Sequence, residues 1–261
     1  MNAKDVMGDR LKIQEQIECA RKADSSKPLM CRLDGRAFHT FTKGLNRPYD
    51  QRLSQLMIDT AKFLVNETHA KLGYTQSDEI TLCWWNTNDE SSYLFGGKYQ
   101  KLTSIIASMA SVYFNKELEN KIPEKAFSKT SKLQLFDARA WNVDNLQEAF
   151  DNFHWRQDDA IKNSISMAAQ AHFSSKLLHG VSGEDKKKML RDMGNPWENQ
   201  PTFFKMGTFV QRQSHQILLT PETLSKIPTQ HHPSGPVMRS KVYELEEQYI
   251  MNSDYLKEIF R

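Results

Sequence analysis

Acidic residues follow two short apolar segments of this chain, at places where they could serve one chemical step. Asp34 ends a segment that begins at residue 29, and Asp78, with Glu79 beside it, comes 44 residues later. Mg²⁺ prefers one or two carboxylates together with phosphate oxygens and water. Two such ions neutralise charge and align the reacting oxygens during phosphoryl transfer. The pattern therefore indicates phosphoryl-transfer chemistry, with Asp34 and Asp78 as shared metal ligands and Glu79 nearby.

Backbone groups next to Asp34 fit the same chemistry. The carbonyl of Gly35 can complete a coordination sphere, and consecutive backbone amides can hold a triphosphate; these belong to Gly35, Arg36, Ala37 and Phe38. Both acidic motifs also have a structural interpretation, because Asp-Gly is a common turn dipeptide and Ser-Asp-Glu suits a hairpin turn or a helix cap. The pattern alone leaves both interpretations open.

Hydrophobic periodicity predicts the elements that position these residues. Residues 29–34 alternate apolar and polar side chains, which predicts a strand with one buried face. Residues 50–68 place apolar side chains on one helical face. Residues 73–78 and 80–85 predict two further strands around the turn at Asp78.

A second helix and a fourth strand complete a recognisable order. Leu102, Ile105, Ile106, Met109 and Tyr113 define one side of the helix, and residues 132–139 predict the strand. Strand, helix, strand, strand, helix, strand is the split βαβ arrangement, an α+β, ferredoxin-like fold with a four-stranded antiparallel sheet and two helices on one face. The first two strands run parallel with the third between them, so Asp34 and the Asp78 turn are expected at one sheet edge.

The rest of the chain predicts a mostly helical C-terminal extension. Helices are expected over 9–23, 146–153, 155–178 and 183–193, a strand over 203–212, and a proline-punctuated loop over 228–236. No segment has the composition of a long flexible linker. We therefore expect a single catalytic unit over 1–261, with a core at about 28–140 and an extension at 141–261.

Composition and charge exclude several classes. The net charge of +3, from 35 basic and 32 acidic residues, permits a nucleic-acid partner without indicating one. Three cysteines without a CxxC pair argue against a disulfide scaffold and a cysteine-rich zinc site. No apolar leader and no stretch of about 20 apolar residues is found, so we expect a soluble, cytoplasmic protein without membrane contact.

Further basic and polar residues are candidates for phosphate binding. Arg156 and Asn163 are seven residues apart, so a helix places both on one face, where they can bind a second triphosphate or form surface salt bridges. Arg139 ends its predicted strand and suits a bidentate phosphate contact. A tRNA backbone contact or simply a solvated helix face is expected for Lys186, Lys187 and Lys188.

The chain resembles the tRNA-His guanylyltransferase family, and most of all its bacterial and archaeal guanylyltransferase-like members. The segments that carry the resemblance are Arg32-Leu33-Asp34-Gly35-Arg36-Ala37-Phe38-His39, Arg47-Pro48-Tyr49-Asp50, Gly73-Tyr74-Thr75-Gln76-Ser77-Asp78-Glu79, Phe136-Asp137-Ala138-Arg139, Trp155-Arg156-Gln157-Asp158-Asp159 and Phe204-Lys205-Met206-Gly207-Thr208. They follow the family's order and cover most of the chain.

This resemblance implies an activity and its cofactors. It implies a polymerase-palm-like core that works as a template-dependent 3′–5′ nucleotidyltransferase on the 5′ end of truncated tRNA. Two Mg²⁺ ions at Asp34, Gly35 and Asp78, ATP or GTP as activating and incoming nucleotides, and a homotetramer belong to the same expectation. It also implies that Ser77 contacts a triphosphate, that His39 and Asp50 lie near the activating base, and that Arg47 lies near phosphate.

One departure from the eukaryotic members affects the expected substrate. Their helix carries a His-Ile-Asn-Asn-Leu-Tyr-Asn-Thr motif, whereas residues 160–167 here lack that histidine and keep only Asn163. This favours the repair-type relatives over addition of a single guanosine to tRNA-His. A palm-type nucleotide cyclase that acts without RNA, and a non-catalytic RNA-binding module, stay open as alternatives; retention of both carboxylates argues against the second.

Overall fold

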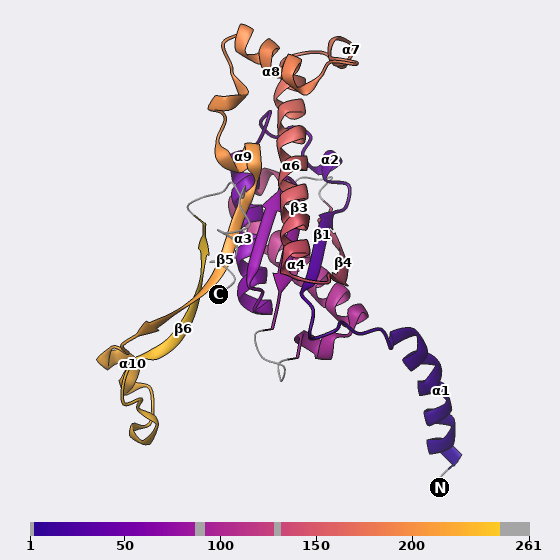
Figure 1. The fold of residues 1–261 in the computed structure, drawn as a ribbon, viewed down its shortest axis with the longest axis vertical. Helices are drawn as coiled ribbons and strands as arrows, with labels where there is room; N and C mark the ends of the chain where they lie inside the picture. The colour runs from indigo at the N-terminus through magenta and orange to yellow at the C-terminus, as the bar shows by residue number, and fades with distance from the viewer. Residues whose placement is uncertain (1–2, 87–91, 128–131, 246–261) are drawn as a thin grey trace.

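The computed structural model describes residues 3–86, 92–127 and 132–245 (Figure 1). In chain order the elements are α1 (Ala3–Cys19), β1 (Leu29–Gly35), α2 (Phe38–Phe41), α3 (Gln51–Thr68), β2 (Leu72–Gln76), β3 (Glu79–Trp84), η1 (Leu94–Gly97), α4 (Tyr99–Lys121), α5 (Pro123–Ala126), β4 (Phe136–Asn142), α6 (Leu146–Gln170), α7 (Ser175–Leu178), α8 (Gly183–Asp192), η2 (Trp197–Asn199), α9 (Thr202–Met206), β5 (Thr208–Ile217), α10 (Pro221–Ser225), η3 (Thr229–His231) and β6 (Val237–Glu244). None of the described helices is long and apolar enough to cross a bilayer.

One antiparallel sheet of six strands organises the molecule, in the order β4-β1-β3-β2-β5-β6. Each neighbouring pair is antiparallel, so β1 and β2 run parallel with β3 between them, as expected. The sheet has two strands more than the four that we predicted, because β5 pairs with β2 and β6 pairs with β5. Residues of the extension thus enlarge the sheet instead of forming helices alone.

Two apolar layers cover the two faces of the sheet. On one face, α3 and α4 bury Leu64 and Phe114 against strand residues such as Leu33 and Ile80. On the other face, α6 packs Phe150 and Phe153 against residues of β1, β2 and β5. Figure 1 shows α6 running along the front of the sheet and α3 behind it. The two predicted helices therefore share one face, and the extension supplies the opposite cover.

Two predicted boundaries are wrong at the edges of the core. The N-terminal helix is Ala3–Cys19 instead of 9–23. The fourth strand is Phe136–Asn142 instead of 132–139. Leu133 and Leu135 suggested a strand by their alternation, but their side chains are 75% and 43% exposed, so the alternation there does not mark a buried face.

The extension also differs from the prediction. Residues 146–170, predicted as parts of two helices, form the single helix α6, because Phe153, Gln157, Ala160 and Ser164 continue one buried face past the expected break. The second predicted helix, 155–178, does not continue to its expected end, because α6 ends at Gln170 and α7 is a separate helix. The strand predicted over 203–212 starts only at residue 208. Gly207 is the reason: it has φ 74° and no room for a Cβ, so it separates α9 from β5.

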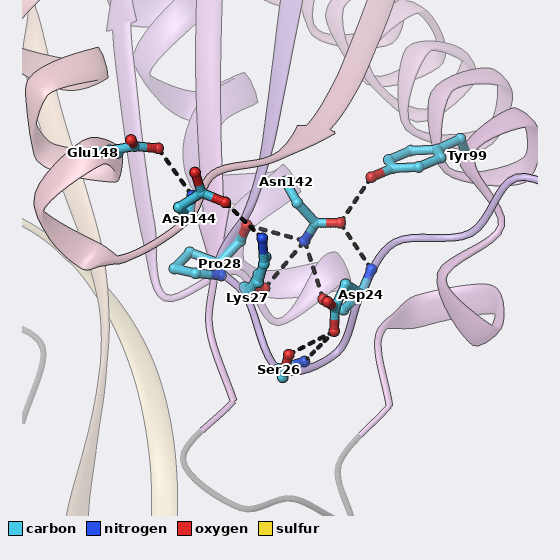
Figure 2. A network of polar contacts seen from close by, with 8 residues as sticks. All are labelled: Asp24, Ser26, Lys27, Pro28, Tyr99, Asn142, Asp144 and Glu148. Atoms are coloured by element: carbon cyan, nitrogen blue, oxygen red, sulfur yellow. Dashed lines mark hydrogen bonds and ion pairs between the residues drawn. The ribbon is translucent and has the colours of Figure 1, made fainter.

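A polar network fixes the sheet at the end opposite to Asp34 (Figure 2). Asn142, the last residue of β4, accepts hydrogen bonds from the Asp24 amide and the Tyr99 hydroxyl, both at 2.8 Å. Its amide nitrogen donates to the carbonyls of Asp24, Lys27 and Pro28 at 3.0–3.1 Å. One side chain thus joins the segment before β1, the end of β4 and the start of α4.

Candidate active site

Three carboxylates lie in a row across the sheet. Asp34 on β1 is paired in register with Glu79 on β3 and with Asp137 on β4. Directly paired residues project to the same face, so all three side chains belong to the face that α6 covers. We call Asp137, Asp34 and Glu79 the acidic row. The pairing confirms that the two predicted acidic motifs meet at one end of the sheet.

Asp78 sits in the β2–β3 turn beside this row. The backbone amide of Gly35 donates to the Asp78 carbonyl at 3.1 Å, which ties the end of β1 to the turn. Ser77 has φ 50°, and its hydroxyl donates to the Asp78 carboxylate at 3.2 Å. Burial raises the pKa of Asp78, and the charge of Asp34 raises it further. Neighbouring carboxylates that disfavour each other's charge are stabilised by a shared cation.

Glu79 is paired with Arg156 of α6. Arg156 Nε donates to Glu79 Oε1 at 2.6 Å, and its Nη2 donates to Asp159 at 2.9 Å. Burial raises the pKa of Glu79, while the hydrogen bond from Arg156 opposes that shift. Because Glu79 is 7% exposed and is held by an arginine, it is less available to a metal ion than Asp34 or Asp78.

A second row lies one pleat away from the acidic row. Arg32 and Arg139 are register partners on the α6 face, two residues from Asp34 and Asp137. Arg32 Nε and Thr81 Oγ1 are buried and have no hydrogen-bond partner among the described residues. Like charges directly opposite each other destabilise a sheet, and here the Glu79 carboxylate lies 4.0 Å from Arg32 Nε. Arg139 contacts Asp137 at 3.3 Å and is exposed, so it is accessible to phosphate.

The loop after β1 offers fewer amides than expected. The amides of Gly35 and Arg36 already donate to the carbonyls of Asp78 and Leu135, so they cannot hold a triphosphate as the structure stands. Ala37, with φ 58°, and Phe38 have no such backbone bond among the described residues. The Phe38 ring is buried against Phe114 and other aromatic rings of the core, so only its backbone can contact a nucleotide.

A cavity of about 560 Å³ adjoins Asp78. Of the residues predicted to bind nucleotide, those that line it are Gly35, Ala37, Phe38, His39, Arg47, Asp50, Ser77 and Asn163. One wall is aromatic, because Tyr49 packs against Phe204 with 4.9 Å between ring centroids and against Phe203 at 5.3 Å. The cavity thus joins polar groups near Asp78 to an apolar wall, a combination that suits a nucleotide.

Asp50 lines the cavity but has a structural task. Its carboxylate caps the N-terminus of α3 by accepting the Arg52 amide at 3.0 Å. It also accepts hydrogen bonds from the Arg52 side chain, from Nε at 3.1 Å and from Nη2 at 2.9 Å. The hydrogen bond from the Arg52 side chain lowers the pKa of Asp50 more than any other influence.

The remaining predicted residues lie outside the cavity. Arg36 is exposed and does not line it, and Arg139 lies on β4. Arg156 does not line the cavity, but it shares one helical face with Asn163, which does, because both side chains donate hydrogen bonds to Asp159. The three consecutive lysines of α8 contact Ser166, Glu184 and Asp192, respectively; these are Lys186, Lys187 and Lys188. Ser166 is three residues from Asn163, so the lysine nearest to the cavity is the first.

The donor set fits Mg²⁺ by its chemistry. Asp34 and Asp78 supply carboxylates, and Gly35 supplies a backbone carbonyl, which is a hard-oxygen set of the size that Mg²⁺ uses when substrate and water complete it. No cluster of three or more His, Cys, Asp or Glu side chains arranged to hold a metal ion occurs within 3–86, 92–127 and 132–245.

Several residues of this site had no role predicted from the sequence. Arg32 and Asp137 carry a signal that could have been used, because each shares a strand face with a predicted residue two positions away. Tyr49 and Phe203 carry no comparable signal, because their place in the cavity wall depends on contacts between distant segments.

Comparisons with known proteins agree with this geometry. A family model for tRNAHis guanylyltransferase (Thg1) matches residues 11–144. A tRNA(His) guanylyltransferase of Debaryomyces hansenii is 28% identical over 71% of this chain and 73% of its own length. A bacterial tRNA(His) guanylyltransferase-like protein solved with ATP is 36% identical, with a TM-score of 0.72 over 79% of this chain and 87% of that one.

A second bacterial structure, solved with GTP, covers almost the whole molecule. It is 30% identical, with a TM-score of 0.73 over 97% of this chain and 98% of that one. Taken with the family match, this identifies a nucleotidyltransferase of the guanylyltransferase-like class. The chain belongs to the tRNAHis guanylyltransferase (Thg1) family.

Proposed function

We propose that this protein adds nucleotides in the 3′–5′ direction to the 5′ end of truncated tRNA, with the opposite strand as template. One observation carries the proposal: the hydrogen bond from Gly35 to Asp78 holds two carboxyl-bearing segments together beside a cavity of about 560 Å³. Bacterial relatives have been solved with ATP and with GTP. We infer that either nucleotide is bound in this cavity.

The proposed catalytic core is palm-like and ferredoxin-like. Its support is the strand order β4-β1-β3-β2, with α3 and α4 packed on one face. We also propose that residues 1–261 act as one catalytic unit. Its support is the pairing of β5 with β2 and the packing of α6 on the core strands.

The proposed reaction has two displacement steps. In the first, an oxygen of the tRNA 5′-phosphate attacks the α-phosphorus of ATP or GTP, and pyrophosphate leaves. In the second, the 3′-hydroxyl of an incoming nucleoside triphosphate attacks the activated 5′-phosphorus, loses its proton, and a nucleoside monophosphate leaves. The product carries one more nucleotide and a 5′-triphosphate.

Residues of this chain position the reactants. Asp34, Asp78 and the Gly35 carbonyl would hold Mg²⁺, which when bound supplies neutralisation of phosphate charge. His39 and Arg47 line the cavity and would contact the activating nucleotide. Arg139, Arg156 and Asn163 are assigned to the second triphosphate or the tRNA 5′ end. For Arg156 this is a partial assignment, since it also neutralises Glu79.

A homotetramer belongs to the proposal as well. Its support is α1, which projects from the body (Figure 1) and carries exposed large apolar side chains. Val6, Ile13 and Ile17 are 56%, 56% and 68% exposed. Burial against another copy would remove this area from water.

A 5′-extension assay tests the proposed activity. The protein is incubated with Mg²⁺, labelled nucleoside triphosphates and two 5′-monophosphorylated tRNAs: tRNA-His without its extra guanosine, and another tRNA lacking its first nucleotide. Templated extension of the truncated tRNA is expected. Extension of tRNA-His alone would favour guanylyltransferase activity, and consumption of nucleotide without any RNA extension would favour a cyclase-like enzyme.

Substitution of the two carboxylates tests the metal assignment. Asp34→Asn and Asp78→Asn are each expected to lower the rate of extension by at least about 100-fold, since each removes a charge that stabilises bound cations. Asp192→Asn is the matched control, because Asp192 is exposed on α8 and forms an ion pair with the exposed Lys188. Turnover within a few-fold of the unsubstituted protein in either site variant would refute the assignment.

A further inference from the structure

Trp155 is the exposed tryptophan among the described residues. Its side chain lies on α6 and is 56% exposed, whereas Trp84, Trp85 and Trp197 are 7–8% exposed. Neighbouring aromatic residues of the same helix, Phe150 and Phe153, are buried against the sheet. Single exposed apolar side chains are common at protein surfaces, so the exposure of this ring does not by itself indicate a ligand.

The indole lies close to the acidic row. The Arg156 guanidinium carbon is 4.7 Å from the centroid of the Trp155 ring. Arg156 donates to Glu79, and Glu79 is the register partner of Asp34. Two contacts therefore connect the indole to Glu79, which is the strand neighbour of the predicted metal ligand Asp34. Because the guanidinium covers one face of the ring, the other face is the one that is available to a ligand.

Strand β4 carries exposed polar side chains at the end of the sheet that holds the acidic row. On β4, at the edge of the core strands, the side chains of Asp137 and Arg139 are 58% and 56% exposed. Figure 1 shows α6 over the middle of the sheet, with β4 at one side. An RNA end that reaches Asp34 from this side would meet a cation on β4 and a flat aromatic surface on α6.

The number of free ring faces indicates which RNA group fits. An unpaired base has two π faces, and proteins that bind single strands stack successive bases on aromatic rings. The last base pair of a duplex has one free face, because the next pair covers the other. Trp155 offers a single face, and no second aromatic ring stacks with it in the part of the chain described here.

We propose that the exposed face of Trp155 is a stacking platform for the terminal base pair of the acceptor duplex. The proposal rests on the proposed function, and it adds a contact that senses whether the 5′-terminal nucleotide is paired. The competing role is purely structural: the indole would shield the ion pair of Arg156 and Glu79 from water, without touching RNA. The two roles differ in their response to RNA and to the end of the duplex.

Fluorescence on the full-length protein distinguishes them. Two 5′-monophosphorylated acceptor-stem hairpins are compared, one with a paired 5′-terminal nucleotide and one with a mismatch at that pair. The Trp155 emission is the difference between the unsubstituted protein and Trp155→Phe, and its quenching by acrylamide is measured with each RNA. The paired hairpin is expected to protect Trp155, and the mismatched hairpin to protect it less.

Binding measured by anisotropy provides the second readout. Trp155→Ala is expected to weaken binding of the paired hairpin by about 5- to 100-fold, the range that loss of one stacked base gives. Trp155→Phe should recover part of it. Phe95→Ala is the control, because Phe95 is a 38% exposed ring in η1, and η1 is hydrogen-bonded through the Gly97 carbonyl to Ala23 in the segment preceding β1.

Two results would overturn the inference and leave the proposed function intact. One is paired-hairpin binding and 5′ extension in Trp155→Ala at unsubstituted levels. The other is protection of Trp155 by ATP or GTP alone, with no added effect of RNA, which would assign the ring to a nucleotide. Failure of the unsubstituted protein to bind either hairpin would overturn both the proposed function and the inference.

Discussion

The position of Gly35 shows how one residue couples the core to the site. It lies between Asp34 and the loop of the cavity, and its amide holds the Asp78 carbonyl. A Cβ at this position would overlap the ring of Phe38, which is packed among other core aromatic side chains. Packing therefore requires glycine at this position, and the same residue supplies the carbonyl assigned to the metal site.

Substitution of this glycine should destabilise the fold. Gly35→Ala is expected to lower the free energy of unfolding by about 1–3 kcal/mol, because the Phe38 ring must move within a dense core. Gly183→Ala is the control, since a Cβ there meets no atom within 4 Å and lies in the first turn of α8. Urea denaturation measures both. Equal stability of Gly35→Ala and the unsubstituted protein would mean that Phe38 relaxes without strain.

Asp50 gives a pH dependence with a defined sign. Hydrogen bonds from Arg52 lower the pKa of Asp50 in the folded protein. A carboxyl group of this kind stabilises the fold above its unfolded pKa of about 3.9, and that contribution is lost as the pH falls through the folded pKa. Asn can replace Asp as the helix cap, so Asp50→Asn removes chiefly the charge interaction.

At pH 7, Asp50→Asn is expected to lower the free energy of unfolding by about 1 kcal/mol, a modest value because the Arg52 side chain is 43% exposed. The difference from the unsubstituted protein should shrink below about pH 4. Thermal denaturation across this range tests it, with Asp192→Asn as the exposed control. A difference that grows as the pH falls would contradict the assignment.

Single residues of the site were predictable where strand alternation and turn chemistry place them. The positions of Asp34 and Asp78 met these conditions, because Asp34 lies near the end of a predicted strand and Asp78 lies in the predicted turn between two strands. The amides of Gly35 and Arg36 did not, since their partners, Asp78 and Leu135, come from other segments. The surroundings of Trp155 could not be predicted for a related reason. Helical spacing assigns the residue to one face of a helix, but it does not show which other segments lie near that face.

Among the elements, β4 is fixed at its end by one side chain. Asn142 joins Asp24, Lys27, Pro28 and Tyr99 (Figure 2). These partners come from the segment before β1 and from α4, so the network holds β1 and β4 in register at the end opposite to the acidic row.

Removal of this side chain should be costly for stability. Asn142→Ala is expected to lower the free energy of unfolding by about 2 kcal/mol, because several backbone carbonyls and the Tyr99 hydroxyl lose a partner. Asn120→Ala is the control, an exposed asparagine of α4 whose bond to Glu117 is 3.4 Å long. Chemical denaturation measures both variants. A loss in Asn142→Ala no larger than in the control would show that water replaces the network.

Helices and strands could be predicted where the hydrophobic period of the sequence agrees with the burial of the side chains in the structure. The strands near Asp34 and Asp78 and helix α3 have clear periodicity and buried faces, and their bounds were close. The strand near Leu133 was misplaced because its apolar side chains are exposed. The start of β5 was missed because the conformation of Gly207 depends on contact with Tyr74 and Thr75.

At the scale of the whole molecule, β5 and β6 form a ribbon that leaves the core (Figure 1). Residues 208–211 of β5 pair with β2, whereas the outer part of β5, to Ile217, has only β6 as a ladder partner. Two-stranded ribbons are marginally stable in water. The ribbon is thus an extension of the sheet with little cover of its own.

Hydrogen exchange should separate this ribbon from the core. Amides of residues 213–217 and 237–241 are expected to exchange at least about 100-fold faster than those of β1 and β3, because they can open without unfolding the sheet. Mass spectrometry of exchanged peptides measures this. Protection equal to that of β3 would indicate that another surface, from a second copy or from RNA, covers the ribbon.

The regular pairing of this ribbon also sets the steps in which its length can change. Side chains alternate between its two faces, so inserting two residues into each strand preserves which face every outer residue occupies. Each such insertion lengthens the ribbon by about 7 Å, whereas a single residue would turn all outer side chains over. The distance that the ribbon spans from the catalytic end is therefore adjustable in units of two residues without any change to the core.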